Sequence, residues 1–236
     1  MVFRDRAHAG QLLAKALRQY RGTDVLVLAL PRGGVPVAAE IARTLSAELD
    51  IVIPRKIGAP GDTELAIGAV SDHGGALINE DLVRALGVPE EYIGQGIARE
   101  RAEIRRRSRL YRGARPAPRI QGRTVIVVDD GIATGYTMLA ALRGVREENP
   151  GRLVAAVPVA PPDSVERLEA EADEVVVLSR PTPFFAVGQF YEDFSQVSDE
   201  EVQDLLMPAG TGDDPQGPPG HDPPEATGNT AGKSVG

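Results

Sequence analysis

The chain has 236 residues and a formal net charge of −8 at pH 7, which argues against general nucleic-acid binding because such binding needs a basic surface. It contains no cysteine, which excludes a disulfide framework, thiolate catalysis and zinc–thiolate sites. No apolar stretch approaches the length of a membrane span and no signal segment opens the chain, so we expect a cytoplasmic protein with no membrane partner.

Helical and extended patterns alternate along the first 207 residues. In chain order they predict a helix over 5–20, a strand over 25–30, a helix over 35–45, a strand over 50–53, a loop over 56–63, strands over 65–70 and 76–78, helices over 81–86 and 89–111, a strand over 125–128, a helix over 138–146, a strand over 152–159, a helix over 162–171, a strand over 174–178 and a short helix over 202–207. This alternation predicts an α/β fold, with a mainly parallel sheet and helices on both faces. Ligands of such sheets bind beyond the carboxyl ends of the strands, where the strand order reverses.

The last 29 residues have a different composition from the rest of the chain. Residues 208–236 hold six prolines and seven glycines and almost no large apolar side chain. Such a segment cannot bury enough apolar surface to offset the entropy lost on ordering. We therefore expect one folded domain over residues 1–207 and a disordered Pro/Gly-rich tail over 208–236.

The segment 124–137, TVIVVDDGIATGYT, carries the clearest chemical pattern. A buried strand is followed by Asp129 and Asp130, then by a loop rich in Gly and Thr at the start of a helix. The first N–H groups of a helix lack partners and can bind a phosphate. The acidic pair would repel phosphate, but it can accept hydrogen bonds from two neighbouring hydroxyls or hold Mg²⁺ through water. Together these groups suit a ribose 5-phosphate.

This pattern resembles the phosphoribosyl-pyrophosphate (PRPP) loop of type I phosphoribosyltransferases, where two acidic residues and Thr-Gly-x-Thr follow an apolar strand. The resemblance covers about residues 5–206 and implies the fold given above, with a small hood and a helical insertion. It also implies that Asp129 and Asp130 act in catalysis by binding the ribose hydroxyls and Mg²⁺. The residues implied in PRPP binding are Gly131, Ile132, Ala133, Thr134, Gly135, Tyr136 and Thr137. The alternative, a metal-binding receiver-like domain, would not require the Thr-Gly-x-Thr sequence.

A second motif, Leu30-Pro31-Arg32-Gly33-Gly34, ends the first strand and opens a helix. Two glycines allow a ligand to approach the backbone closely, and the Arg32 guanidinium offers a fork of donors to phosphate oxygens. An ordinary strand-to-helix turn would also fit the segment taken alone. With the downstream motif present, it resembles the pyrophosphate loop of the same family, so we expect Arg32, Gly33 and Gly34 to bind pyrophosphate.

The expected loop after the second strand contains Lys56, one of only three lysines in a chain that otherwise uses Arg. Members of the family carry a mobile loop in this part of the chain, which closes over the reacting centre. Lys56 or Arg55 could then assist departure of pyrophosphate as a catalytic residue, and we expect Lys56 because the chain uses lysine so rarely. A plain surface loop is the alternative.

An aromatic-rich segment over residues 180–191 is implied by the resemblance to form part of the hood over the acceptor base. Phe184 or Phe185 could stack on a flat heterocycle, and Val187 could present backbone groups to its edge. Alternatively, these aromatic rings fill the core over the last strand. Position 133 is Ala, whereas hypoxanthine-guanine enzymes of the family usually carry Asp there, which weighs against that substrate class.

The long helix expected over 89–111 is rich in Arg, interleaved with Glu100 and Glu103. This pattern favours a solvated, salt-bridged face or a subunit contact of a homodimer over a surface that binds anions or nucleic acid.

Taken together, the motifs predict a Mg²⁺-dependent phosphoribosyltransferase that moves the 5-phosphoribosyl group of PRPP to a nitrogenous base and releases pyrophosphate. One alternative is a regulator that senses PRPP or a nucleotide on the same fold without turnover. Such sensors usually carry a DNA-binding segment, and no helix-turn-helix signature precedes Arg32. Hydrolysis or phosphorolysis of a ribosyl compound is a third alternative. The acceptor base is not identified by these residues.

Overall fold

The computed structural model describes residues 1–73 and 75–207, so the predicted tail over 208–236 lies outside the described residues. The helices are α1 (Arg6–Ala16), α2 (Gly34–Leu45), α3 (Glu80–Leu86), α4 (Glu90–Arg112), α5 (Tyr136–Glu147), α6 (Pro162–Glu169) and α7 (Asp199–Leu206), with short 3₁₀ turns η1 (Arg18–Tyr20) and η2 (Val187–Phe190). The strands are β1 (Val25–Ala29), β2 (Glu48–Ile51), β3 (Arg55–Ala59), β4 (Asp62–Val70), β5 (Ala76–Ile78), β6 (Thr124–Val128), β7 (Arg152–Val159) and β8 (Glu174–Ser179).

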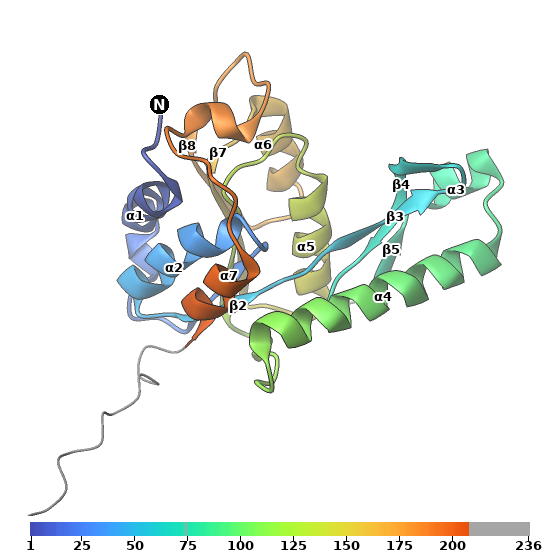
Figure 1. Ribbon diagram of the computed structural model, residues 1–236, viewed down its shortest axis with the longest axis horizontal. Helices are drawn as coiled ribbons and strands as arrows, with labels where there is room; N and C mark the ends of the chain where they lie inside the picture. The colour runs from blue at the N-terminus through green and yellow to red at the C-terminus, as the bar shows by residue number, and fades with distance from the viewer. Residues whose placement is uncertain (74, 208–236) are drawn as a thin grey trace, which may run out of the picture.

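The central sheet has five parallel strands in the order β2-β1-β6-β7-β8. Side chains alternate between its two faces, so Val27 of β1 joins the core under α1, α2 and α7 whereas Leu28 joins the core under α5 and α6. Helices thus cover both faces, which confirms the predicted fold class (Figure 1). The chain leaves β1 toward β2 on one side and β6 toward β7 on the other. The carboxyl ends of β1 and β6 therefore flank the point where the strand order reverses.

The loop predicted over residues 56–63 is wrong, because these residues belong to a second, antiparallel sheet with the order β3-β4-β5. Ile57 and Ala59 alternate with more exposed neighbours and bury their side chains, as expected for a strand that packs on one face. Only Pro60 and Gly61 form the turn, where Gly61 has a φ of +81°. The Gly and Pro residues marked a hairpin turn and not an open loop.

The second sheet and the two helices that follow it form the helical insertion, which projects away from the central sheet in Figure 1. We call residues 55–112 the arm. Helix α4 runs along β3 and β4, and the Tyr92 hydroxyl donates to the Gly58 carbonyl oxygen at 3.2 Å. The far end of α4 returns to the central sheet, where Arg112 Nε donates to Asp50 Oδ1 at 2.7 Å. No helix in the described part of the chain has the length and apolar character needed to cross a membrane.

Candidate active site

The two predicted loops meet at the carboxyl edge of the central sheet. A Cβ atom added to Gly33 would overlap the carboxylate of Asp130, and one added to Gly34 would lie 2.7 Å from the Val128 carbonyl oxygen. The two motifs are nearly 100 residues apart in the sequence, yet only the lack of side chains at these glycines leaves room for their contact. We call residues 31–34 and 129–137 the switch-point site.

Asp129 and Asp130 follow β6 directly, and groups from distant parts of the chain hold Asp130. Arg6 Nε donates to Asp130 Oδ2 at 2.7 Å, and the Tyr191 hydroxyl donates to the Asp130 carbonyl oxygen at 2.6 Å. Burial, and then the charge of Asp130, raises the pKa of the Asp129 carboxyl well above its usual range. Burial also raises the pKa of Asp130, although the hydrogen bond and the positive charge of Arg6 lower it in part. The raised pKa values show that burial disfavours negative charge on this pair, so hydroxyl donors or a cation would stabilise the ionised carboxylates.

The loop after the acidic pair is held to β7 and α6 by hydrogen bonds, while several of its residues remain exposed to solvent. The Ile132 N–H donates to the Val159 carbonyl oxygen at 2.9 Å, and the Ser164 hydroxyl donates to the Ala133 carbonyl oxygen at 2.8 Å. Gly135, with a φ of +82°, precedes α5 and offers no side chain to cap it. The first N–H groups of α5 therefore have no partner within residues 1–73 and 75–207, and the exposed Thr134 precedes them in the chain. This arrangement suits a phosphate.

Arg32 lies between β1 and α2, after a cis peptide bond that joins it to Pro31. Its Nη1 atom is 3.8 Å from Asp199 Oδ1 at the start of α7. The same carboxylate oxygen accepts a hydrogen bond from the Tyr111 hydroxyl at 2.6 Å. The predicted pyrophosphate loop is thus linked through Asp199 to the end of α4.

The three residues predicted to contact the acceptor base lie in different environments. Phe184 packs against Phe190, with ring centroids 5.1 Å apart, as the core interpretation of this segment required. Phe185 is 82% exposed, so its ring is accessible for stacking. Val187 packs against Gly131 of the switch-point site, since a Cβ on that glycine would be 2.5 Å from Val187 Cγ1. The aromatic segment therefore lies beside the acidic loop, as expected of a hood.

Lys56 lies on β3 with an exposed side chain, in a strand that pairs with β4 and packs near α4. The segment predicted as a mobile loop is a hairpin, which pairs regularly where Lys56 lies and shifts register at Gly58 and at Ala59. Its predicted role therefore depends on how this hairpin lies relative to bound substrate.

Four residues that support the acidic pair were not predicted from the sequence: Arg6, Tyr191, Phe194 and Ser195. The Arg6 guanidinium lies 3.9 Å from the centroid of the Phe194 ring and donates through Nη1 to the Ser195 carbonyl oxygen at 2.7 Å. The N-terminal segment pairs with this region, because the Phe3 N–H donates to the Phe190 carbonyl oxygen at 2.8 Å. No local pattern could have revealed these contacts, since 124 residues separate Arg6 from Asp130.

Comparisons with known proteins cover both loops of this site. The chain matches the family model described as phosphoribosyl transferase domain over residues 5–195. It is 44% identical over 205 residues to a protein of Mycobacterium tuberculosis strain H37Rv that carries the provisional name phosphoribosyl transferase Rv0571c. That match covers 87% of this chain but 46% of the relative, so the chain spans less than half of its length. The solved structure of TT1426 from Thermus thermophilus is 49% identical, with a TM-score of 0.78, over 87% of this chain and 98% of that one.

Proposed function

Because this chain belongs to the phosphoribosyl transferase domain family, we propose that it transfers a 5-phosphoribosyl group from PRPP to a nitrogenous base. The bond between the anomeric carbon and the pyrophosphate oxygen breaks, a carbon–nitrogen bond forms, and the base nitrogen releases its proton. One observation carries the proposal, namely the contact of Gly33 with Asp130 at the switch point. A molecule with pyrophosphate at one end and a 5-phosphate at the other would reach both loops from there.

Each end of PRPP would meet groups suited to its chemistry. The 5-phosphate would lie on the loop from Thr134 to Thr137 and on the unpaired N–H groups of α5. The two ribose hydroxyls would donate to Asp129 and Asp130. The pyrophosphate would lie on Gly33 and Gly34, with the Arg32 guanidinium as donor. In a transition state with positive charge on the ribose, the nearby carboxylates would stabilise that charge.

The acidic pair also fits the Mg²⁺ that the family uses with PRPP. Two adjacent carboxylates, one with a pKa raised by burial and by the charge of the other, would be stabilised as anions by a divalent cation. Asp129 and Asp130 would hold the ion together with water and substrate oxygens. When bound, Mg²⁺ would supply positive charge to the departing pyrophosphate.

The acceptor base would lie near the hood formed by residues 184–190. The exposed Phe185 ring offers a stacking surface, and Val187 is positioned by its contact with Gly131. Because Phe184 packs into the core beside Phe190, we expect Phe185 and not Phe184 to provide the stacking.

Lys56 would stabilise the leaving pyrophosphate through its ammonium group. A contact made mainly in the transition state lowers kcat when it is removed and changes substrate binding less. We expect Lys56→Ala to lower kcat by about 100-fold. Turnover at the wild-type rate would show that Lys56 is an ordinary surface residue.

The test is release of pyrophosphate on incubation with PRPP, Mg²⁺ and a panel of purine, pyrimidine and other nitrogenous bases. We expect release that depends on one class of base, and formation of the corresponding nucleoside monophosphate. Release without any base would indicate hydrolysis. PRPP binding by calorimetry without turnover on any base would support a regulator instead.

A further inference from the structure

The seven arginines of α4 fall into two groups according to their partners. Four of them form ion pairs: Arg99 with Glu100, Arg106 and Arg107 with Glu103, and Arg112 with Asp50 and Asp72. The other three are Arg101, Arg105 and Arg109. The side chains of these three make no ion pair and no hydrogen bond with any residue that the structure describes. The predicted salt-bridged helix is therefore confirmed for one set of arginines and leaves the other set unexplained.

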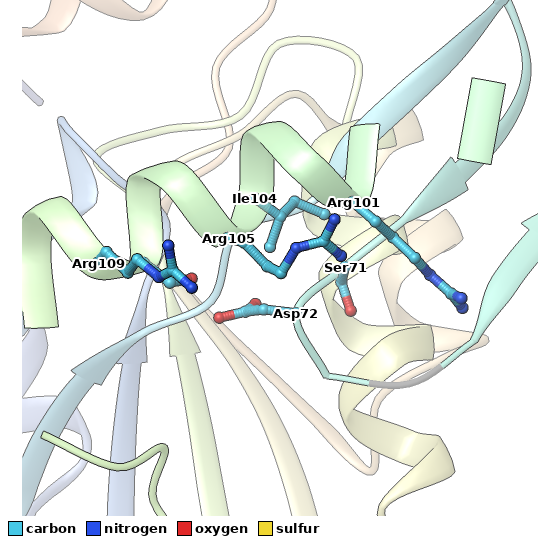
Figure 2. Close-up of a pocket in the computed structure, with 7 residues that line it drawn as sticks. Ser71, Asp72, Arg101, Ile104, Arg105 and Arg109 are labelled. Atoms are coloured by element: carbon cyan, nitrogen blue, oxygen red, sulfur yellow. The ribbon is translucent and has the colours of Figure 1, made fainter. Parts of the chain in front are cut away.

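The three unpaired arginines share one face of the helix because they are spaced by four residues. They line a cavity of about 340 Å³ together with Ser71 and Asp72, on the loop after β4, and with Ser108 of α4 itself. Figure 2 shows Arg101, Arg105 and Arg109 along α4, with Ser71 and Asp72 beside them. We call this the α4 cavity. Its volume lies in the range of pockets that hold small molecules.

Two residues that line the cavity, Asp72 and Ser108, each have a buried polar atom without a hydrogen-bond partner among the described residues. The Ser108 hydroxyl oxygen is inaccessible to solvent and has no hydrogen-bond partner within the described residues. A buried hydroxyl without a partner is unfavourable, and rotation of the Ser108 side chain toward the cavity would let the hydroxyl donate to an acceptor atom on a ligand. This observation is independent of the arginines and indicates the same place.

The one carboxylate that lines the cavity does not cancel the positive charge. Asp72 Oδ1 accepts a hydrogen bond from the Ile53 N–H at 2.7 Å, and its Oδ2 atom lies 3.0 Å from Arg112 Nη2. Asp72 Oδ2 accepts no hydrogen bond within the described residues, and the ion pair with Arg112 offsets its negative charge. The three free guanidinium groups leave the cavity electropositive in a chain with a net charge of −8.

We propose that the α4 cavity binds a small molecule that carries a diphosphate or triphosphate. Three residues at four-residue spacing extend over about 12 Å of helix, which is longer than a single phosphate needs. Each guanidinium can present two parallel N–H groups to phosphate oxygens. The recess and the hydroxyl of Ser108 fit a small ligand better than an extended nucleic acid, whose binding the negative net charge opposes.

This cavity is distinct from the switch-point site, because none of its lining residues belongs to residues 31–34 or 129–137. The proposal therefore does not depend on phosphoribosyl transfer. Helix α4 links the two places, because its Tyr111 donates to the Asp199 carboxylate that lies near Arg32.

The experiment is calorimetric titration of the full chain with inorganic tripolyphosphate at 150 mM salt (about physiological ionic strength). The test variant is Arg101→Ala/Arg105→Ala/Arg109→Ala. Its matched control is Arg99→Ala/Arg106→Ala/Arg107→Ala, which removes the same charge from the same helix but only from paired arginines. Alanine favours helix at all six positions, so both variants should fold, and circular dichroism checks this.

We expect the test variant to bind tripolyphosphate about 100-fold more weakly than the wild type, since three charge-assisted contacts are lost. The control should bind within about threefold of the wild type, because its three arginines do not line the cavity. Ser108→Ala should weaken binding several-fold by removing the hydroxyl. Equal binding by both triple variants would place the ligand elsewhere, for example on the switch-point site, and would overturn the proposal.

Two further titrations identify the source of the phosphate groups. ATP or GTP binding more tightly than tripolyphosphate would show that the recess also contacts a nucleoside, and similar affinities would show that the phosphates alone are recognised. Either result supports a small polyphosphate ligand. An oligonucleotide that binds more tightly than both, with an affinity that rises with its length, would overturn the proposal in favour of a nucleic-acid surface.

Discussion

The switch-point site and the arm both place arginines beside carboxylates, but they use them differently. Arg6 and Asp130 at the switch point have side chains only 12% and 13% exposed, whereas Arg106 on the arm is 62% exposed beside Glu103. Hydrogen bonds from Arg106, and then from Arg107, lower the pKa of Glu103 to about 2. A buried pair holds a carboxylate in one position, while an exposed pair is screened by solvent. Position in the fold, and not residue type, therefore decides what each arginine contributes.

The largest difference in PRPP affinity between variants of the two regions should follow from neutralising the acidic pair. We expect Asp129→Asn/Asp130→Asn to weaken PRPP binding by about 100-fold or more, because the acceptors for the ribose hydroxyls and the Mg²⁺ ligands are lost. The control, Glu90→Gln/Glu91→Gln, neutralises two exposed carboxylates at the start of α4 and should leave PRPP binding unchanged. Calorimetry with PRPP and Mg²⁺ measures both, and unchanged affinity in the first variant would remove the ribose-binding assignment.

A smaller but still clear effect is expected at Gly33. Its backbone conformation would accept alanine, but the added Cβ would meet the Asp130 carboxylate. We expect Gly33→Ala to displace that carboxylate and weaken PRPP binding by about tenfold, a difference of about 1.4 kcal/mol. On the arm, a Cβ at Gly94 would meet nothing within 4 Å, so Gly94→Ala should raise the free energy of unfolding by up to about 1 kcal/mol without changing PRPP binding. Equal PRPP affinities for the two variants would contradict the close contact of the two loops.

The two kinds of ion pair can be compared directly in stability. Arg6→Met leaves the buried Asp130 carboxylate without its partner and should lower the free energy of unfolding by about 3 kcal/mol. Arg106→Met removes an exposed pair and should cause no measurable change. Urea denaturation measures both variants at pH 7. A similar decrease in the free energy of unfolding in both variants would show that burial does not set the stability contribution of these ion pairs.

The smallest expected effect is at the joint between the regions, where Tyr111 of α4 donates to Asp199. Tyr111→Phe should lower the free energy of unfolding by about 1 kcal/mol at pH 8. Burial, and then this hydrogen bond, raises the pKa of Tyr111 from 10.0 to about 12, so the folded state favours the neutral phenol. This contribution is complete below pH 10 and is lost as the pH rises from 10 toward 12.

The wild type and Tyr111→Phe should therefore differ less at pH 11 than at pH 8, as measured by urea denaturation at both values. A difference between them that grew with pH would contradict the assigned direction of the pKa shift.

Much of the fold could be predicted because its signals are local. The apolar run over 125–128 and the alternation of strands with helices were sufficient for the parallel sheet, with boundaries within a few residues of those observed. Ile57 and Ala59 carried a strand signal too, but the Gly and Pro residues around them were interpreted as a loop. That error arose because a two-residue turn and an open loop share the same residue types.

The sequence by itself determined the chemistry offered at each loop: an acidic pair, a Gly- and Thr-rich helix start, and a forked cation beside two glycines. These are properties of neighbouring residues, so they can be read along the chain. Only the tertiary structure decided that Arg6 holds Asp130 and that Arg101, Arg105 and Arg109 remain without partners among the described residues while other arginines of α4 are paired. Pairing depends on which groups come within about 4 Å in space, and packing between elements far apart in the chain sets those distances.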